Sequence, residues 1–208
     1  STTYVLTQDD VGAEITASVS YTDDYSTDET VTSTATGTIA NANDDPTGSL
    51  TISGTQAQGS TLSLSNTIAD ADGLGSFTYQ WLRYGSAISG ASSTTYVLTQ
   101  DDIGTIITAS VSYTDGYSTD ETVTSAATGT IANTNDDPTG SLTISGTQTQ
   151  GSTLSLSNTI ADADGLGSFT YQWLRDGSAI SGASSTTYVL TQDDVGAEIT
   201  ASVSYTDD

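Results

Sequence analysis

Apolar and polar residues alternate along most of this chain, in short runs separated by turns. Leu50 and Ile52 alternate with Thr51, and the same period-two pattern recurs in Phe77–Trp81 and Ile107–Tyr113. Gly, Asp and Ser residues separate the runs, and no segment shows a helical stripe of apolar residues. Such a pattern is typical of an all-β sandwich. We expect further strands at residues 62–64, 96–98 and 122–131, with a loop at 115–121 before the last one.

The pattern repeats with a period of 92 residues, since residues 1–24 are identical to residues 185–208 with an intervening copy starting at Ser93. Solenoid repeats are about 20–50 residues long, and one such unit cannot bury its own core. A unit of 92 residues has the size of a small independent domain. We therefore predict tandem β-sandwich domains arranged end to end: the C-terminal part of one repeat in residues 1–45, a complete repeat in 46–137, and the N-terminal part of the next in 138–208.

Differences between the copies predict which side chains face the core. Ile106 is replaced by Glu14 and Glu198 in the other two copies, whereas Ile107 is Ile in all three. A position that accepts both Ile and Glu faces water, so its neighbour faces the core. Because side chains alternate between the two faces of a strand, this comparison sets the register of the strand.

Several motifs resemble those of a known family. Tyr79-Gln-Trp-Leu-Arg, then Tyr96-Val-Leu and Asp102-Ile-Gly, resembles the immunoglobulin-like signature of a core Trp on strand C and an Asp-x-Gly turn before strand F. The chain departs from that signature in having no Cys for the inter-sheet disulfide. The longer string from Asp70 to Arg83, with Asn-Asp-Asp-Pro at the repeat boundaries, is similar to tandem bacterial immunoglobulin-like (cadherin-like) extender repeats of giant RTX-type adhesins.

That resemblance covers the whole chain and implies a function. Such repeats are structural extenders, or stalks, of secreted or cell-surface bacterial adhesins, and they support adhesion or biofilm formation. They hold a distal ligand-binding tip away from the cell, so the ligand site would lie outside this segment. Their partners are the neighbouring repeats of the same chain, and Ca²⁺ commonly stiffens them. The resemblance therefore implies an extracellular location.

The composition excludes several other classes of function. The chain carries 26 acidic residues against two Arg, with no Lys, His or Cys. Nucleic acids and anionic membrane surfaces both require Lys and Arg, so neither is an expected partner. No apolar run approaches the roughly 18 residues of a membrane span, so we expect no membrane insertion. A Ser/His or Cys/His nucleophile pair is also impossible.

The acidic residues gather in positions that suggest a cation site. All nine acids of the complete repeat fall in predicted turns or linkers. In an antiparallel sandwich the linker, the B–C loop and the F–G loop share one end, because successive strands run up and down. That end would collect Asn43, Asp44, Asp45, Asp70, Asp72, Asp115, Asp120 and Glu121. The opposite end, with Asp101 and Asp102, would meet the next linker and loop, which contain Asn135, Asp136, Asp137, Asp162 and Asp164.

Calcium is the cation that this set of side chains favours. Ca²⁺ takes six to eight oxygen ligands from carboxylates, carbonyls and Asn. The spacing of Asn43-Asp-Asp-Pro and Asp70-Ala-Asp is also similar to cadherin-type linkers. We predict Ca²⁺ at the domain junctions, with ordinary turn formation by Asp and Gly as the alternative. Asp101 and Asp102 are the weakest candidates, because the Asp-x-Gly turn accounts for Asp102 without a metal.

Two other functions remain open beside the extender. Self-assembly into an extracellular filament or sheath, with lateral strand pairing between chains, would use exposed sheet edges. A repeated carbohydrate-binding module would gain avidity from its repetition. Paired carboxylates such as Asp70 and Asp72 also occur in glycoside hydrolases. A catalytic pair repeated in every domain has no catalytic rationale, however, so we do not expect an enzyme.

Overall fold

The computed structural model describes residues 2–207 and is all-β, as the alternating pattern predicts. Its other elements are three single-turn 3-10 helices, η1 (Gln8–Asp10), η2 (Gln100–Asp102) and η3 (Gln192–Asp194). The chain divides into two compact units, Ser1–Asn133 and Thr134–Asp208. The linker around Asp136 thus belongs to the second unit, and residues 1–45 belong to the first. The end-to-end arrangement of the repeats stays a prediction.

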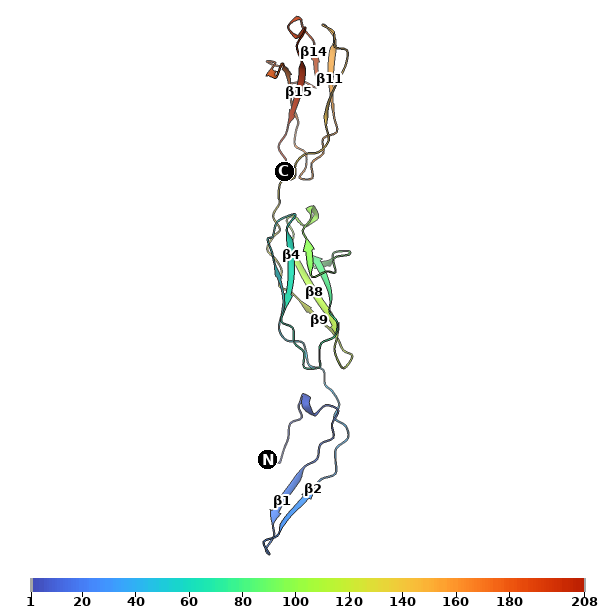
Figure 1. The fold of residues 1–208 in the computed structure, drawn as a ribbon, viewed down its shortest axis with the longest axis vertical. Coiled ribbons are helices and arrows are strands. Elements are labelled where there is room, and N and C mark those ends of the chain that lie inside the picture. Colours follow the sequence, from blue (N-terminus) through green and yellow to red (C-terminus); the bar gives the residue numbers. More distant parts are fainter. Residues whose placement is uncertain (1, 208) are drawn as a thin grey trace. The chain divides into compact units, whose positions relative to one another are not determined.

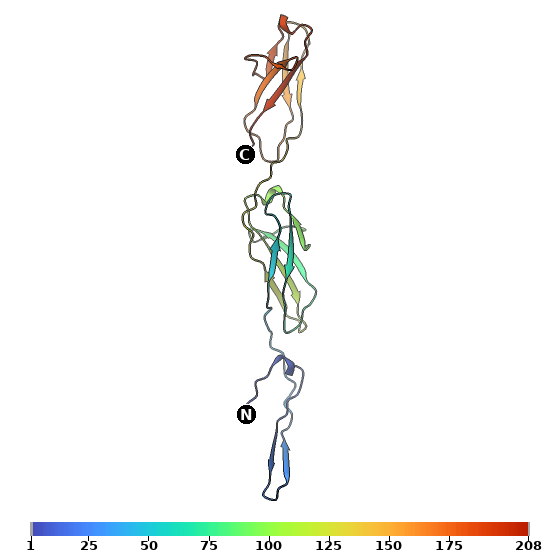
Figure 2. The ribbon, with the colours of Figure 1, turned by 60° about the vertical axis from the view of Figure 1, so that its left-hand side comes forward.

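Residues 46–133 of the first unit, which we call the central sandwich, form two antiparallel sheets (Figure 1). One sheet has the strand order β3 (Leu50–Ser53), β4 (Thr61–Asn66) and β7 (Thr95–Val97). The other has the order β6 (Ser86–Ala87), β5 (Thr78–Arg83), β8 (Ile107–Thr114) and β9 (Asp120–Thr124). The two sheets face each other as layers, which is clearest in the side view (Figure 2).

Trp81 on β5 is the centre of the core between these sheets. Its side chain is fully buried, its indole Nε1 donates to the carbonyl of Ser93 at 2.9 Å, and its ring packs against Tyr96. Ile107 is fully buried and Ile106 is 36% exposed, which confirms the register expected from the differences between copies. The complete set of buried apolar residues is Leu50, Leu62, Ile68, Trp81, Leu98, Ile107, Ala109, Val111, Tyr113 and Ile131.

The end of the central sandwich differs from the prediction of one strand at residues 122–131. Strand β9 begins at Asp120 and ends at Thr124, so Asp120 and Glu121 lie in a strand rather than in a loop. Cross-strand pairing with β8 places both residues in the strand, because Glu121 lies opposite Tyr113 and Asp120 lies opposite Thr114. Residues 125–132 then continue as an extended segment, and its Ile131 is buried in the core.

The N-terminal segment of the first unit, residues 2–45, forms one hairpin of β1 (Ser18–Thr22) and β2 (Asp28–Thr32) besides η1. It carries the counterparts of β8 and β9 but not those of β3–β6. Val19 and Tyr21 are more than half exposed, whereas their counterparts Val111 and Tyr113 are buried.

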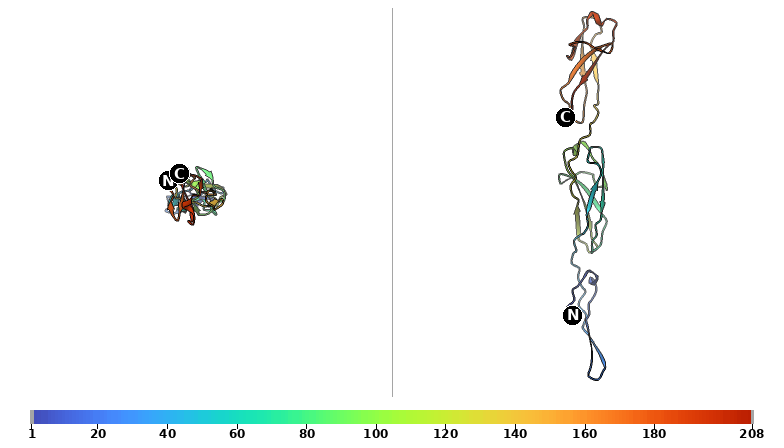
Figure 3. Two further views of the ribbon diagram at one scale, coloured as in Figure 1. Left: turned by 90° about the horizontal axis from the view of Figure 1, so that it is seen from above. Right: turned by 90° about the vertical axis from the view of Figure 1, so that its left-hand side faces the viewer.

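The second unit repeats the topology of the central sandwich as far as residue 207 (Figure 3). One sheet has the order β10 (Leu142–Ser145), β11 (Thr153–Asn158) and β14 (Thr187–Val189). The other has the order β13 (Ser178–Ala179), β12 (Thr170–Arg175) and β15 (Ile199–Ser204). Trp173 is fully buried between them, so both Trp residues are core residues. We call residues 138–207 the second sandwich.

Candidate metal centre

Three segments that are distant in sequence meet at one end of the central sandwich. The backbone N–H of Asp44 in the linker donates to Oδ2 of Asp72 at 2.8 Å. The Tyr113 hydroxyl donates to Oδ2 of Asp70 at 2.6 Å. Asn43 Nδ2 donates to Oε1 of Glu121 at 2.9 Å. These contacts confirm that three elements share one end: the linker, the loop between β4 and β5 (residues 67–77, the B–C loop) and the β8–β9 hairpin with its loop (residues 115–119, the F–G loop).

The Asp70–Asp72 turn holds two carboxylates beside the F–G loop. Its backbone is set locally, since the N–H of Asp72 donates to Oδ1 of Asp70 at 2.9 Å, an Asx-type turn. The carbonyl of Asp72 then accepts from the N–H of Gly116 at 3.0 Å. A Cβ at position 116 would lie 2.5 Å from that carbonyl oxygen, so this close approach requires glycine. Asp72 is 4% exposed.

Asp115 carries an oxygen that the protein leaves without a partner. Its Oδ1 accepts from the backbone N–H groups of Tyr117 and Thr119, each at 2.8 Å. Its Oδ2 is buried and has no hydrogen-bond partner, and among residues 2–207 the same holds only for Oδ1 of Asn41 in the linker. A buried carboxylate oxygen without a donor is costly unless something else compensates its charge. A cation would do so.

In the second unit the corresponding carboxylates lie closer together. One oxygen from each of Asp162, Asp164 and Asp207 lies within 4.8 Å of the others, a spacing that no other trio of acidic residues reaches between residues 2 and 207. Asp162 and Asp207 line a hollow of about 270 Å³, together with Asn135, Asp136, Pro138, Val203, Ser204 and Tyr205. Unit charges at this separation repel by about 0.9 kcal/mol per pair in water. The trio therefore favours the binding of a cation.

A tyrosine hydroxyl holds one carboxylate in place at each of the two sites. Tyr205 donates to Oδ2 of Asp162, as Tyr113 does to Asp70. That hydrogen bond, with burial and the nearby charges of Asp162 and Asp207, raises the pKa of Tyr205 to about 12. Burial and the hydrogen bond to Asp70 likewise raise the pKa of Tyr113. Both tyrosines stay neutral donors, so they position carboxylates without adding charge.

The linker of the second unit approaches its acidic loop as in the first. The N–H of Asp136 donates to Oδ2 of Asp164 at 2.7 Å, and Nδ2 of Asn135 donates to the carbonyl of Asp136 at 3.2 Å. The remaining predicted ligands of this group lie at the periphery. Asp45 and Asp137 are exposed, and Oδ1 of Asp120 accepts from the Thr114 hydroxyl at 2.7 Å.

Both carboxylate oxygens of Asp102 already accept hydrogen bonds from other groups of the fold. Its Oδ1 accepts from Nε of Arg83 at 2.8 Å. Its Oδ2 accepts from the Tyr96 hydroxyl at 2.8 Å and from the backbone N–H of Thr99 at 2.7 Å. Burial alone would raise the pKa of Asp102, but these hydrogen bonds outweigh it and hold the pKa below its ordinary value. Asp102 is thus the buried acceptor that orders the turn before β8.

Asp101, beside it, is exposed, and Nη1 of Arg83 lies 3.8 Å from its Oδ2. No contact in the structure supports a metal at this pair of acids, and we leave both out of the ligand set proposed below. Arg83, which follows Trp81 on β5 and which the sequence predicts to cap a carbonyl or extend to solvent, instead donates to Asp102.

Asn41 and Asp207 are two candidate ligands that the sequence pattern missed. Asp207 follows from the 92-residue period, because it is the counterpart of Asp115. Asn41 has no such signal, because its counterpart Asn133 is not among the predicted ligands and the burial of its Oδ1 depends on tertiary packing.

Comparison with models of protein families and with curated proteins finds no match for this chain. Between residues 2 and 207 no helix combines the length and the hydropathy that crossing a bilayer would require.

Proposed function

We propose that this chain consists of extender repeats from the stalk of a secreted or cell-surface bacterial adhesin, with Ca²⁺ stiffening the joints between repeats. The observation that carries the proposal is the gathering of linker, B–C loop and F–G loop carboxylates at one end of each sandwich. The proposal is supported by the recurrence of these acidic residues every 92 residues, the same period as that of Trp81 and Trp173. A stalk of this kind would act in adhesion or biofilm formation.

The residues that would hold Ca²⁺ follow from the geometry. In the second unit they are Asp162, Asp164 and Asp207, which lie within 4.8 Å of one another. In the first unit they are Asp70, Asp72 and Asp115, with the buried Oδ2 of Asp115 as the oxygen that lacks a donor. All are hard oxygen ligands, which Ca²⁺ prefers.

Ca²⁺ bound at these sites would stiffen the linker, because one carboxylate in each site would ligate the ion and also accepts a hydrogen bond from the linker backbone. Asp72 accepts from the linker N–H of Asp44, and Asp164 accepts from that of Asp136. An ion that fixes the Asp72 or Asp164 side chain fixes the acceptor that anchors the linker. Extracellular modules bind Ca²⁺ with dissociation constants of about 10⁻⁴–10⁻³ M. At about 10 mM Ca²⁺ such a site adds roughly 1.4–2.7 kcal/mol to the state that binds it.

Calorimetric unfolding of the 208-residue chain tests the proposal. We expect millimolar Ca²⁺ to raise the melting temperature and EDTA to lower it. Small-angle scattering in the same buffers should show a narrower distribution of particle dimensions with Ca²⁺. Mg²⁺ is the control, because it is smaller, demands octahedral geometry and loses its water reluctantly. Identical melting and scattering with Ca²⁺ and EDTA would overturn the proposal.

Asp115→Asn sharpens this test because its effect should change sign with Ca²⁺. In EDTA we expect the variant to be as stable as the parent or more stable by up to about 1 kcal/mol, since it removes a carboxylate charge whose buried Oδ2 has no donor. In Ca²⁺ it should be less stable than the parent, because a ligand is lost. Asp101→Asn is the matched control and should behave like the parent in both buffers. Destabilisation of Asp115→Asn by the same amount in both buffers would show a purely structural role.

A further inference from the structure

One side-chain hydrogen bond connects η1 of the N-terminal segment to the B–C loop of the central sandwich. Nε2 of Gln8 donates to Oδ1 of Asp72 at 2.9 Å, although the two residues are 64 positions apart in the sequence. Gln8 is half-buried, whereas Thr7 and Asp9 on either side of it are exposed. Asp72 is 4% exposed. The hydrogen bond is therefore largely shielded from solvent.

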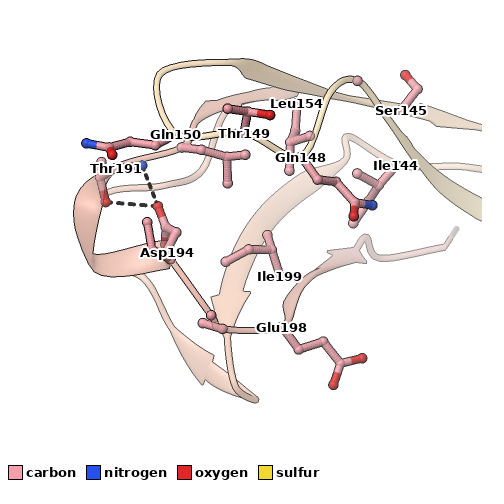
Figure 4. Close-up of a pocket in the computed structure, with 15 residues that line it drawn as sticks. Ile144, Ser145, Gln148, Thr149, Gln150, Leu154, Thr191, Asp194, Glu198 and Ile199 are labelled. Atoms are coloured by element: carbon pink, nitrogen blue, oxygen red, sulfur yellow. Dashed lines mark hydrogen bonds between the residues drawn. The ribbon is translucent and has the colours of Figure 1, made fainter.

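The turn that carries Gln8 is fixed by hydrogen bonds within its own repeat. Gln8 begins η1, and the N–H and the hydroxyl of Thr7 donate to Oδ2 of Asp10 at 2.8 and 3.2 Å. Figure 4 shows the same two hydrogen bonds, from Thr191 to Asp194, in the second sandwich. Because the turn has the same local structure in both places, the position of Gln8 is a property of the repeat itself.

Gln8 gives the N-terminal segment a second attachment to the central sandwich. The linker is the first, since the N–H of Asp44 donates to Oδ2 of Asp72. The turn with Gln8 is in turn held by the segment that leads to the linker, because the N–H of Gly12 donates to the carbonyl of Ile39 at 2.9 Å. A segment attached at the linker alone can rotate about it. A second contact away from the linker restrains that rotation.

A neutral amide donor suits this position because its surroundings are negatively charged. Asp72 lies beside Asp70 and the F–G loop with Asp115, so a carboxylate at position 8 would be repelled. The chain has no Lys, and its two Arg residues pair with Asp102 and Asp194. The Gln8 amide adds no charge, and its hydrogen bond to an ionised acceptor belongs to the stronger class of hydrogen bonds.

We propose that the η1 turn is the surface by which one repeat docks on the next, with Gln8 as the residue that recognises the carboxylate of Asp72. This contact needs no ion, so it goes beyond the Ca²⁺ sites of the proposed function. Gln8 recurs as Gln100 and Gln192, and Asp72 recurs as Asp164, so the repeat carries both partners with its 92-residue period. The joint between the N-terminal segment and the central sandwich is therefore ordered before any ion binds.

A distance measurement between two spin labels in EDTA tests the docking without any contribution from Ca²⁺. The chain has no Cys, so Thr32→Cys in β2 and Thr51→Cys in β3, both at exposed positions, place one label on each side of the joint. We expect a narrow distance distribution in this labelled parent and a broad one after Gln8→Ala. The ratio of docked to undocked forms should fall by about tenfold, because a hydrogen bond to a charged group is lost.

Two further variants separate the contact from a general loss of structure in the turn. Gln8→Glu should broaden the distribution at least as much as Gln8→Ala, because it places a second carboxylate beside Asp72. Asp9→Ala changes the exposed neighbour in the same turn and should keep the distribution of the parent. Equal distributions for the parent and Gln8→Ala, whether narrow or broad, would overturn the proposal. Equal broadening by Asp9→Ala would also overturn it, because the turn rather than the contact would then be responsible.

The side-chain amide of Gln8 reports on the hydrogen bond directly. In a nitrogen–proton correlation spectrum recorded in EDTA, Asp72→Ala should shift the Nε2 resonances of Gln8 and leave those of the exposed Gln148 unchanged. An unshifted Gln8 amide would show that Asp72 is not its acceptor. These experiments contain no Ca²⁺, so their failure leaves the proposed Ca²⁺ sites untouched. Identical melting in Ca²⁺ and EDTA would in the same way leave the docking contact untouched.

Discussion

The central sandwich and the second sandwich have nearly the same sequence and the same strand pairing, yet they enclose their cores differently. Trp81 lies opposite Ala109 in one ladder and Trp173 lies opposite Ala201 in the other, in the same register. Along β8 every second residue is buried, from Ile107 to Tyr113. Along β15 the corresponding residues are only half-buried.

The difference comes from residues 120–132, whose counterparts lie outside the residues that the structure describes. In the central sandwich β9 pairs with β8, and the backbone N–H groups of Ser125, Thr128 and Ile131 donate to the carbonyls of Ala109, Ile107 and Thr105. The side chain of Ile131 is 1% exposed and completes the core. Burial of β8 therefore depends on contacts with residues 120–132 as well as on its pairing with β5.

Truncation of matched core residues should reveal this difference most strongly. Ile107→Ala should destabilise the first unit by about 2–5 kcal/mol, the range for a fully buried Ile. Ile199→Ala should cost the second unit less than half of that, because the side chain of Ile199 is only half-buried. Urea unfolding followed by Trp fluorescence can separate the units, with Trp173→Phe to report on the first and Trp81→Phe on the second. Equal losses would mean that the lower burial of Ile199 does not weaken the core.

Replacement of the buried carboxylate in the turn before β8 (Asp102) or before β15 (Asp194) should give the next largest loss of unfolding free energy. Asp102→Asn leaves Arg83 without its carboxylate and should cost about 1–3 kcal/mol. Asp194→Asn should cost less, because Asp194 is 7% exposed and Asp102 is fully buried. The same two single-Trp backgrounds measure both variants. A larger loss for Asp194→Asn would contradict the order of enclosure that we infer.

Acid titration should give a smaller effect on the second unit. Burial opposes ionisation of Asp194, but hydrogen bonds from Thr191, Arg175 and Tyr188 outweigh it and lower the pKa from 3.8 to about 2. A carboxylate with a lowered pKa stabilises the folded state above its unfolded pKa, and this contribution is lost as the pH falls towards the folded value. The unfolding free energy of the second unit should thus decline between pH 4 and 2. Asp194→Asn should decline less steeply over that range.

The smallest effect should come from Ile106→Glu, which copies the residue found at positions 14 and 198. Ile106 is 36% exposed, so we expect a change within about 0.5 kcal/mol. Thermal unfolding measures it. A loss of more than about 1 kcal/mol would mean that the central sandwich uses this position in its core, which the other copies cannot do.

Much of the candidate site could be read from the sequence because turns are local. Asp70, Asp72 and Asp115 lie in loops that alternation and Gly content predict, and antiparallel topology places those loops at one end. Asp120 and Glu121 were misplaced because cross-strand pairing extends β9 backwards, which depends on the opposing strand. The Asp-x-Gly turn accounts for Asp102 without a metal, but its pairing with Arg83 escaped prediction, because Arg83 is 19 residues away and lies on another strand.

The sequence by itself determined the all-β class, the 92-residue period, the Trp cores and the register of β8, because side-chain alternation and repetition are properties of neighbouring positions. Only the tertiary structure decided which carboxylate oxygen is left without a donor and which residue compensates the buried charge of Asp102. Both depend on contacts between segments that are distant in sequence. Asp115 Oδ2 and the Arg83–Asp102 pair are the places where those contacts matter.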